Sequence, residues 1–148
     1  MAAASLCLFG AAEQDDAKAL PDGPGKEIVA KACIDCHGAA NFRKKRLSED
    51  EWWEQVADMV ARGAKATERE QTAVVAYLAK NFGQNSKVDM NSAPISEILV
   101  VLGFTASDSQ AIVAYRADYG SFKEWHDLLK VPGVDARKVE DKKELMAF

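Results

Sequence analysis

Two cysteines three residues apart, followed directly by a histidine, constrain this chain more than any other feature of its sequence. They form the motif C-I-D-C-H at residues 33–37. A structural zinc site needs four ligands, and no second C-x-x-C or H-x-x-x-H pattern follows. A thiol redox pair is expected between a strand and a helix, whereas residues 25–33 have the apolar spacing of a helix. The adjacent histidine favours covalent attachment of haem c.

The motif assigns a role to each of its reactive side chains. Cys33 and Cys36 are predicted to form two thioether bonds to the porphyrin, and His37 to bind the iron on the proximal side. The predicted cofactor is therefore one haem c with its iron. The third cysteine, Cys7, lies in an apolar N-terminal run and would be lost if that run is cleaved.

Residues 26–83 resemble a small class I c-type cytochrome, an all-helical family in which the first helix ends in C-x-x-C-H. Two more helices are predicted, and each begins with a capping box, Ser48 with Glu51 and Thr67 with Glu70. The sequence of this stretch is also similar to that of cytochrome modules of periplasmic quinohaemoprotein dehydrogenases. The resemblance implies an electron carrier rather than an enzyme.

The cytochrome resemblance also implies a second axial ligand, usually a methionine shortly before the last helix. Met59 lies eight residues before Thr67 and is the predicted distal ligand to the iron. Met59 also shares a helical face with Trp52 and Val56, so a place in the apolar core is the alternative. Met90 could compete for the iron, but it lies beyond the last helix of the cytochrome segment.

Four consecutive cations, residues 43–46, follow the haem motif within one short loop. Arg43 is assigned to the haem propionates, because guanidinium groups bind carboxylates in good geometry. The cluster would equally serve to steer an acidic redox partner toward the haem, or form a solvated loop. The predicted partners are therefore redox proteins, with a periplasmic dehydrogenase as one candidate.

The N-terminus predicts export. Residues 2–12 form an apolar run, followed by an acidic stretch with small residues where a peptidase could cut. Residues 1–20 are therefore interpreted as a signal peptide or a disordered N-terminus, although no lysine or arginine precedes the run. No segment approaches about 20 apolar residues, so no membrane span is predicted. A periplasmic location follows from this interpretation.

Residues 88–148 resemble a tandem helix-hairpin-helix domain, as found in bacterial competence DNA receptors and in a small extrinsic photosystem subunit. The stretches that carry the likeness are VDMNSA, AIVAYRADYGSF and DLLKVPGV. The expected helix caps in this region are Asn91 or Ser92, Ser107 with Gln110, and Ser121 with Glu124. With a short linker QNSK between the two parts, the whole chain is predicted to be all-α.

The hairpin turns argue against DNA binding. DNA-binding hairpins of this family use a Gly-hydrophobic-Gly turn whose N–H groups meet phosphate, but Thr105 and Asp135 stand at the second glycine position. The region also carries a net charge of −3, from seven basic and ten acidic side chains. Cations dominate non-specific DNA affinity. Those that could still form one basic face are Lys130, Arg137, Lys138, Lys142 and Lys143.

These observations rank three functions. The first is a periplasmic electron-transfer cytochrome with one haem, whose helix-hairpin-helix module docks proteins. The alternative is a haem-containing protein that binds DNA through that module. A haem peroxidase is disfavoured, because no paired carboxylates or second haem motif accompany the first.

Overall fold

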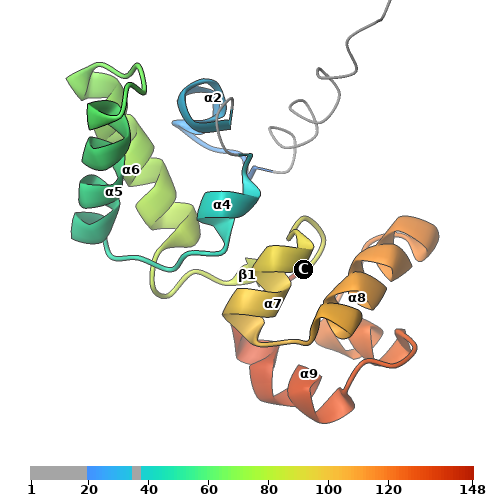
Figure 1. Ribbon diagram of the computed structural model, residues 1–148. Helices are drawn as coiled ribbons and strands as arrows, with labels where there is room; N and C mark the ends of the chain where they lie inside the picture. Colours follow the sequence, from blue (N-terminus) through green and yellow to red (C-terminus); the bar gives the residue numbers. More distant parts are fainter. Residues whose placement is uncertain (1–19, 35–37) are drawn as a thin grey trace, which may run out of the picture.

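The computed structural model describes residues 20–34 and 38–148 and is mainly helical (Figure 1). The N-terminal region, residues 20–82, contains α2 (Lys26–Val29), the π-helical η1 (Ala30–Ile34), α4 (Ala40–Arg43), α5 (Glu49–Ala61) and α6 (Glu68–Phe82). The C-terminal region, residues 83–148, contains β1 (Val88–Asp89), α7 (Ile95–Leu102), α8 (Ala106–Tyr119), η2 (Trp125–Lys130), α9 (Ala136–Lys142), η3 (Lys143–Leu145) and β2 (Met146–Ala147). The strands in this part of the chain have only two residues each, so the predicted all-α class is confirmed.

The N-terminal region is built on the pair α5 and α6, which pack side by side (Figure 1). Both predicted capping boxes are present, and each satisfies the backbone N–H groups of the N-cap residue and of the glutamate three residues later. The apolar face of α6 is buried against α2 and α5, and Trp52 of α5 is only 2% exposed. The buried core comprises Leu20, Val29, Ile34, Ala39, Trp52, Val74, Val75, Tyr77, Leu78 and Phe82.

A glycine lets α2 approach α6 closely. Gly25 precedes α2 with a φ of 96°, in the left-handed region that glycine adopts most readily. A Cβ atom there would lie 2.8 Å from the Ala73 carbonyl oxygen and 2.9 Å from the Tyr77 Cβ. The Tyr77 hydroxyl donates to the Pro21 carbonyl at 2.6 Å, and burial raises the pKa of Tyr77 to about 12. The start of α2 is thus held on the face of α6.

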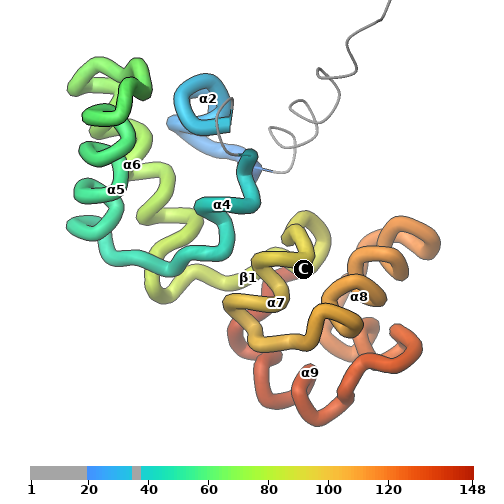
Figure 2. The backbone as a smooth tube through the Cα atoms, in the orientation of Figure 1, coloured from blue at the N-terminus to red at the C-terminus, as the bar shows by residue number. Residues whose placement is uncertain are grey.

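The C-terminal region has its own core and is closed by its two strands. In it, α7 packs on α8 and α9 packs on η2. The parallel pair of β1 and β2 aligns Val88 with Met146 and returns the chain end to the start of the region (Figure 2). The buried core comprises Val88, Met90, Ala93, Ile98, Leu102, Phe104, Ile112, Phe122, Leu128, Val131, Val139 and Met146.

The helix caps of the C-terminal region differ from those predicted. Thr105, two residues before Ser107, caps α8 and forms a capping box with Asp108. At α7 the N-cap is Pro94, without a side-chain hydrogen bond, and η2 starts after Glu124, also without one. Several Ser, Thr and Asp residues cluster before each helix, and packing decides which of them takes the cap. Gly120 ends α8, and its N–H donates to the Arg116 carbonyl oxygen.

The QNSK segment is tied to the N-terminal region. The Ser86 hydroxyl accepts from the Gly83 N–H at 2.9 Å and donates to the Lys80 carbonyl at 3.1 Å. The Arg46 Nε donates to the Ser86 carbonyl oxygen at 3.1 Å. This connection is therefore an ordered turn rather than a free linker. Among the described residues, no helix is long and apolar enough to cross a membrane.

Candidate functional site

Two hairpin turns mark the first candidate site. The first runs from the end of α7 through Gly103 to the start of α8, and the second runs from η2 through Gly133 to the start of α9. Both glycines have a positive φ, 71° and 84° respectively, which an L-residue adopts at a cost. Each turn therefore leads the chain sharply into a helix N-terminus, whose N–H groups carry partial positive charge.

A lysine connects the two turns. The Lys138 Nζ, in the first turns of α9, donates to the Gly103 carbonyl oxygen at 2.8 Å. The same ammonium lies 6.0 Å from the centroid of the Phe104 ring, within reach of a cation–π contact. The start of α9 is therefore held against the first turn, so both turns belong to one surface of the molecule.

The residues at the second glycine positions act as helix caps. Thr105 Oγ1 accepts from the Asp108 N–H at 3.1 Å, and Asp135 Oδ1 accepts from the Arg137 N–H at 3.0 Å. Each side chain therefore satisfies a backbone donor that would otherwise face a bound anion. The structure explains how the turns keep their shape without a second glycine, and it places the Asp135 carboxylate at the second turn.

Part of the predicted basic face is engaged in local contacts. Lys130 pairs with Asp127 at 2.6 Å. Hydrogen bonds from Lys130 and then from the Lys123 N–H lower the pKa of the Asp127 carboxyl to about 2, so this pair stays ionised and internally neutral. Lys143 lies 5.1 Å from the centroid of the Trp125 ring. Arg137 is exposed at the second turn and is the clearest remaining cation there.

A cavity of about 740 Å³ in the N-terminal region is the second candidate site. Its volume lies in the range of roughly 300–1,000 Å³ that small-molecule sites occupy. The wall is formed by α5, α6, η1 and the segment around α4, and most of it is apolar. The lining residues are Ala32, Cys33, Asn41, Phe42, Lys44, Lys45, Trp52, Gln55, Val56, Met59, Val60, Arg62, Gly63, Ala64, Ala66, Val74 and Leu78.

The structure brings two of the predicted cofactor residues to this cavity. Cys33 from η1 and Met59 from α5 both line it. Cys36 and His37 lie outside the described residues, so their predicted roles stay predictions. Met90 is fully buried in the C-terminal core, away from the cavity. The other histidine, His126, is exposed, stacks on Trp125 and pairs with Glu124.

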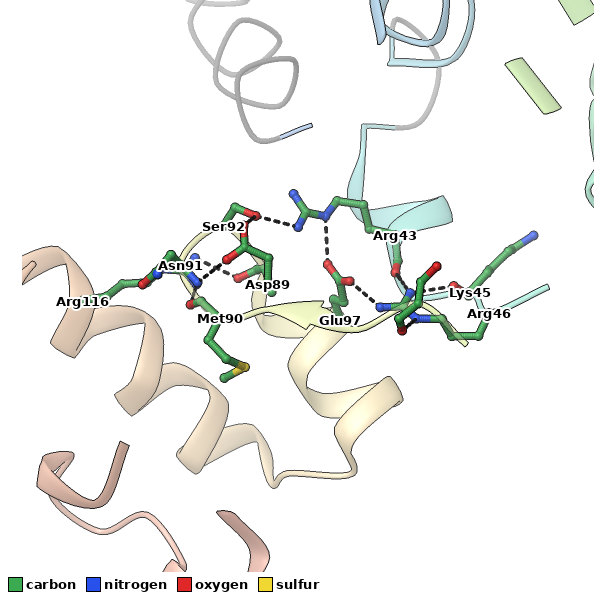
Figure 3. Close-up of polar contacts among 11 residues, drawn as sticks. Arg43, Lys45, Arg46, Asp89, Met90, Asn91, Ser92, Glu97 and Arg116 are labelled. Carbon is green, nitrogen blue, oxygen red and sulfur yellow. Dashed lines mark hydrogen bonds and ion pairs between the residues drawn. The ribbon is translucent and has the colours of Figure 1, made fainter. Parts of the chain in front are cut away.

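Arg43, predicted to bind the haem propionates, does not line the cavity in the described part of the chain. It is 1% exposed and its Nε donates to Glu97 Oε2 of α7 at 2.8 Å (Figure 3). Its Nη2 also donates to the Ser92 hydroxyl at 3.1 Å. Lys44 and Lys45 of the same cation cluster do line the cavity, and Lys45 donates to Gln55 across it.

Glu97 is a site residue that sequence reasoning missed. Its two carboxylate oxygens accept from Arg43 and, at 2.7 Å, from the Arg46 Nη2, and its side chain is only 2% exposed. The signal in the sequence is Glu97 itself, the one acidic residue in the largely apolar segment at residues 95–102. An unpaired carboxylate there would be costly to bury, so a cationic partner had to exist.

Comparison with known proteins identifies the C-terminal region. Residues 83–146 match the family model described as a helix-hairpin-helix motif. A stretch of 58 residues, 39% of this chain, is 33% identical to ComE operon protein 1 of Bacillus subtilis. The chain covers 28% of the length of that relative. No solved structure matches the chain.

These matches correct the function predicted first. They show a helix-hairpin-helix motif in residues 83–146 and similarity to a ComE operon protein, so the prediction of a periplasmic electron-transfer cytochrome is wrong. Neither match supports the cytochrome, haem, iron or electron-transfer assignments that went with it. Within residues 20–34 and 38–148, no group of three or more His, Cys, Asp and Glu side chains is placed to hold a metal. The C-terminal region of this chain is a helix-hairpin-helix domain.

Proposed function

We propose that this protein binds DNA through its helix-hairpin-helix domain, as a binding protein rather than an enzyme. The match of residues 83–146 to the motif is the observation that carries the proposal. The resemblance to competence DNA receptors and the similarity to ComE operon protein 1 support the same function. This reverses the order of the sequence interpretation, which ranked protein docking above DNA binding.

The geometry of the two turns suits contact with a phosphate backbone. Each turn ends at a helix N-terminus, and Lys138 holds the two turns on one surface. Backbone N–H groups at such positions bind phosphate without reading the bases, so the binding is expected to be independent of sequence. The caps by Thr105 and Asp135 and the net negative charge of the domain predict weak affinity, in the micromolar range or above (roughly 10⁻⁶ to 10⁻⁴ M).

Reversing the charge at the second turn is expected to weaken DNA binding. Arg137→Glu should raise the Kd for a fluorescent duplex about tenfold at low salt, because a phosphate partner is replaced by a repelling carboxylate. The slope of log K against log salt concentration should also become shallower by about 1 to 2, since fewer counterions are released. Fluorescence anisotropy over a salt series measures both quantities.

Two matched variants make this test specific. Lys65→Glu changes the charge equally on an exposed loop between α5 and α6, and it should leave the Kd within about twofold of wild type. Asp135→Asn keeps an N-cap but removes the carboxylate charge at the turn, so it should tighten binding by about threefold or more. Equal effects of Arg137→Glu and Lys65→Glu would contradict a site at the hairpin turns.

For the cavity we propose a covalently attached haem c, within a c-type haem-binding fold of residues 26–83. The residues present fit the group: the cavity is large and mostly apolar, and both Cys33 and Met59 line it. Lys44 and Lys45 stand on its wall, where they suit carboxylates such as the propionates. A bound haem would supply an iron centre, with Met59 among the residues that would hold it. Attachment of this kind also supports an exported, periplasmic location.

Haem attachment is tested on the intact matured chain. Protein expressed with haem-maturation machinery should keep a porphyrin absorbance after denaturation, and its mass should increase by one haem. Cys33→Ser should leave one thioether bond to the haem. The double variant Cys33→Ser with Cys36→Ser should leave none. An unmodified mass for the wild-type chain would overturn the cofactor proposal and leave the DNA-binding proposal standing.

A further inference from the structure

A buried ion triad joins the two regions, and neither function proposed above uses it. Glu97 of α7 pairs with Arg43 at 2.8 Å and with Arg46 at 2.7 Å (Figure 3). The side chains of Glu97 and Arg43 are 2% and 1% exposed. Arg43 and Arg46 also stand 5.8 and 6.0 Å from the centroid of the Phe82 ring. Helices α4 and α7 are in contact along this seam.

The segment that supplies both arginines also forms a wall of the cavity. Asn41, Phe42, Lys44 and Lys45 line the cavity, whereas Arg43 and Arg46 pair with Glu97. Residues 41–46 therefore face the cavity on one side and the helix-hairpin-helix domain on the other. A ligand in the cavity would touch this segment directly, one residue away from the ion pairs.

The segment has little intrinsic stability. Its helix, α4, has four residues and no side-chain cap, which is far below the length at which a helix is stable alone. Its position is held from the side of α7. The Arg43 Nη2 reaches Ser92, whose hydroxyl in turn donates to Asp89 at 2.7 Å. Phe42 also packs on Phe82 of the N-terminal core. Contacts from the C-terminal domain therefore hold the side of the wall that carries Arg43 and Arg46.

We propose that Glu97, a residue of the helix-hairpin-helix domain, is a positioning residue for the cavity of the N-terminal region. Its two oxygens hold Arg43 and Arg46, so that the residues between them form the cavity wall. This inference deepens the cofactor proposal above and depends on it for the identity of the ligand. Because binding free energies are reciprocal, a ligand that favours the ordered wall also favours the docking of α7, the first helix of the first hairpin.

The position of the wall can be tested without any ligand. Amide hydrogen exchange of the full chain, purified without haem maturation, should speed up at least tenfold in residues 39–47 of Glu97→Gln. Exchange in α9 should stay unchanged in the same protein. Glu140→Gln makes the same chemical change on an exposed residue of the same domain and should match wild type throughout. If residues 39–47 of Glu97→Gln exchange at the wild-type rate, the proposal is overturned.

The effect on binding is measured with haemin added to the same proteins. Haemin should quench the fluorescence of Trp52, which lines the cavity, and Glu97→Gln should weaken haemin binding about tenfold relative to wild type and Glu140→Gln. Equal haemin affinity in all three would overturn the positioning role. If wild type takes up no free haemin, the exchange experiment decides the role of Glu97, and the mass of the matured chain decides the cofactor proposal.

A milder substitution tests the same network if Glu97→Gln does not fold. Ser92→Ala removes one hydrogen bond to Arg43 and leaves the ion triad intact. In this variant, exchange in residues 39–47 should speed up and haemin binding should weaken, each by about threefold. No change in either measurement would contradict the role assigned to this network.

Discussion

Replacing Glu97 by alanine is expected to lower the free energy of unfolding by about 3–5 kcal/mol, the cost of removing one partner from a buried ion pair. Arg43 would then lie 1% exposed without its carboxylate, and the hydrogen bond to Ser92 would offset only part of its desolvation. Arg46 loses less, because its side chain is 13% exposed and can reach water. Urea unfolding followed by tryptophan fluorescence measures the loss.

An apolar replacement of the pair separates ionic loss from packing. In Arg43→Leu with Glu97→Leu, both fully buried charges are removed and only Arg46, which is 13% exposed, remains at the seam. Most of the stability lost in Glu97→Ala should therefore return. In the double variant the cavity wall should nevertheless be less well positioned, because a leucine side chain forms no hydrogen bonds. If the double variant were less stable than Glu97→Ala by several kcal/mol, the seam would depend on more than this charge pair.

Replacing Trp52 by alanine is the second change with a large expected effect. Trp52 is 2% exposed in the core between α5 and α6, and its indole N–H donates to the Phe82 carbonyl at 3.3 Å. Its removal should cost about 3–5 kcal/mol, from lost apolar burial and the space left behind. The lost donor adds to this, because the Phe82 carbonyl is left with one partner fewer.

The neighbouring tryptophan is a matched control. Trp53 lies next in the same helix but is 36% exposed, and Trp53→Ala should cost about 1 kcal/mol or less. Chemical denaturation of the two variants side by side gives the comparison, with circular dichroism as the signal because each variant lacks a fluorophore. Similar losses in both would mean that the assigned faces of α5 are reversed.

Local features were predicted well from the sequence. The capping boxes at Ser48 and Thr67 are present because each needs only residues three positions apart. The cap of α8 differs from the predicted one because several polar residues precede this helix, and Thr105 rather than Ser107 forms the capping box, with Asp108. The resemblance of residues 88–148 to helix-hairpin-helix domains was confirmed, because that likeness is carried by contiguous stretches of sequence.

Function was harder to predict than fold. The C-x-x-C-H motif predicts a cofactor and says nothing about what the protein does with it, so the electron-transfer function did not follow. The absence of the second glycine from each turn argues against DNA binding, whereas the likeness of the whole domain favours it. In the structure, Thr105 and Asp135 keep both turns shaped by capping the helices that follow.

The sequence by itself determined the helices, their strongest caps and the identity of the C-terminal domain. These depend on neighbours a few residues apart, where periodicity and backbone hydrogen bonding act directly. Only the tertiary structure decided that Arg43 pairs with Glu97, 54 positions away, rather than facing the cavity. An arginine in a loop can serve a cofactor, a partner or another helix, and which it meets depends on how separately formed helices pack.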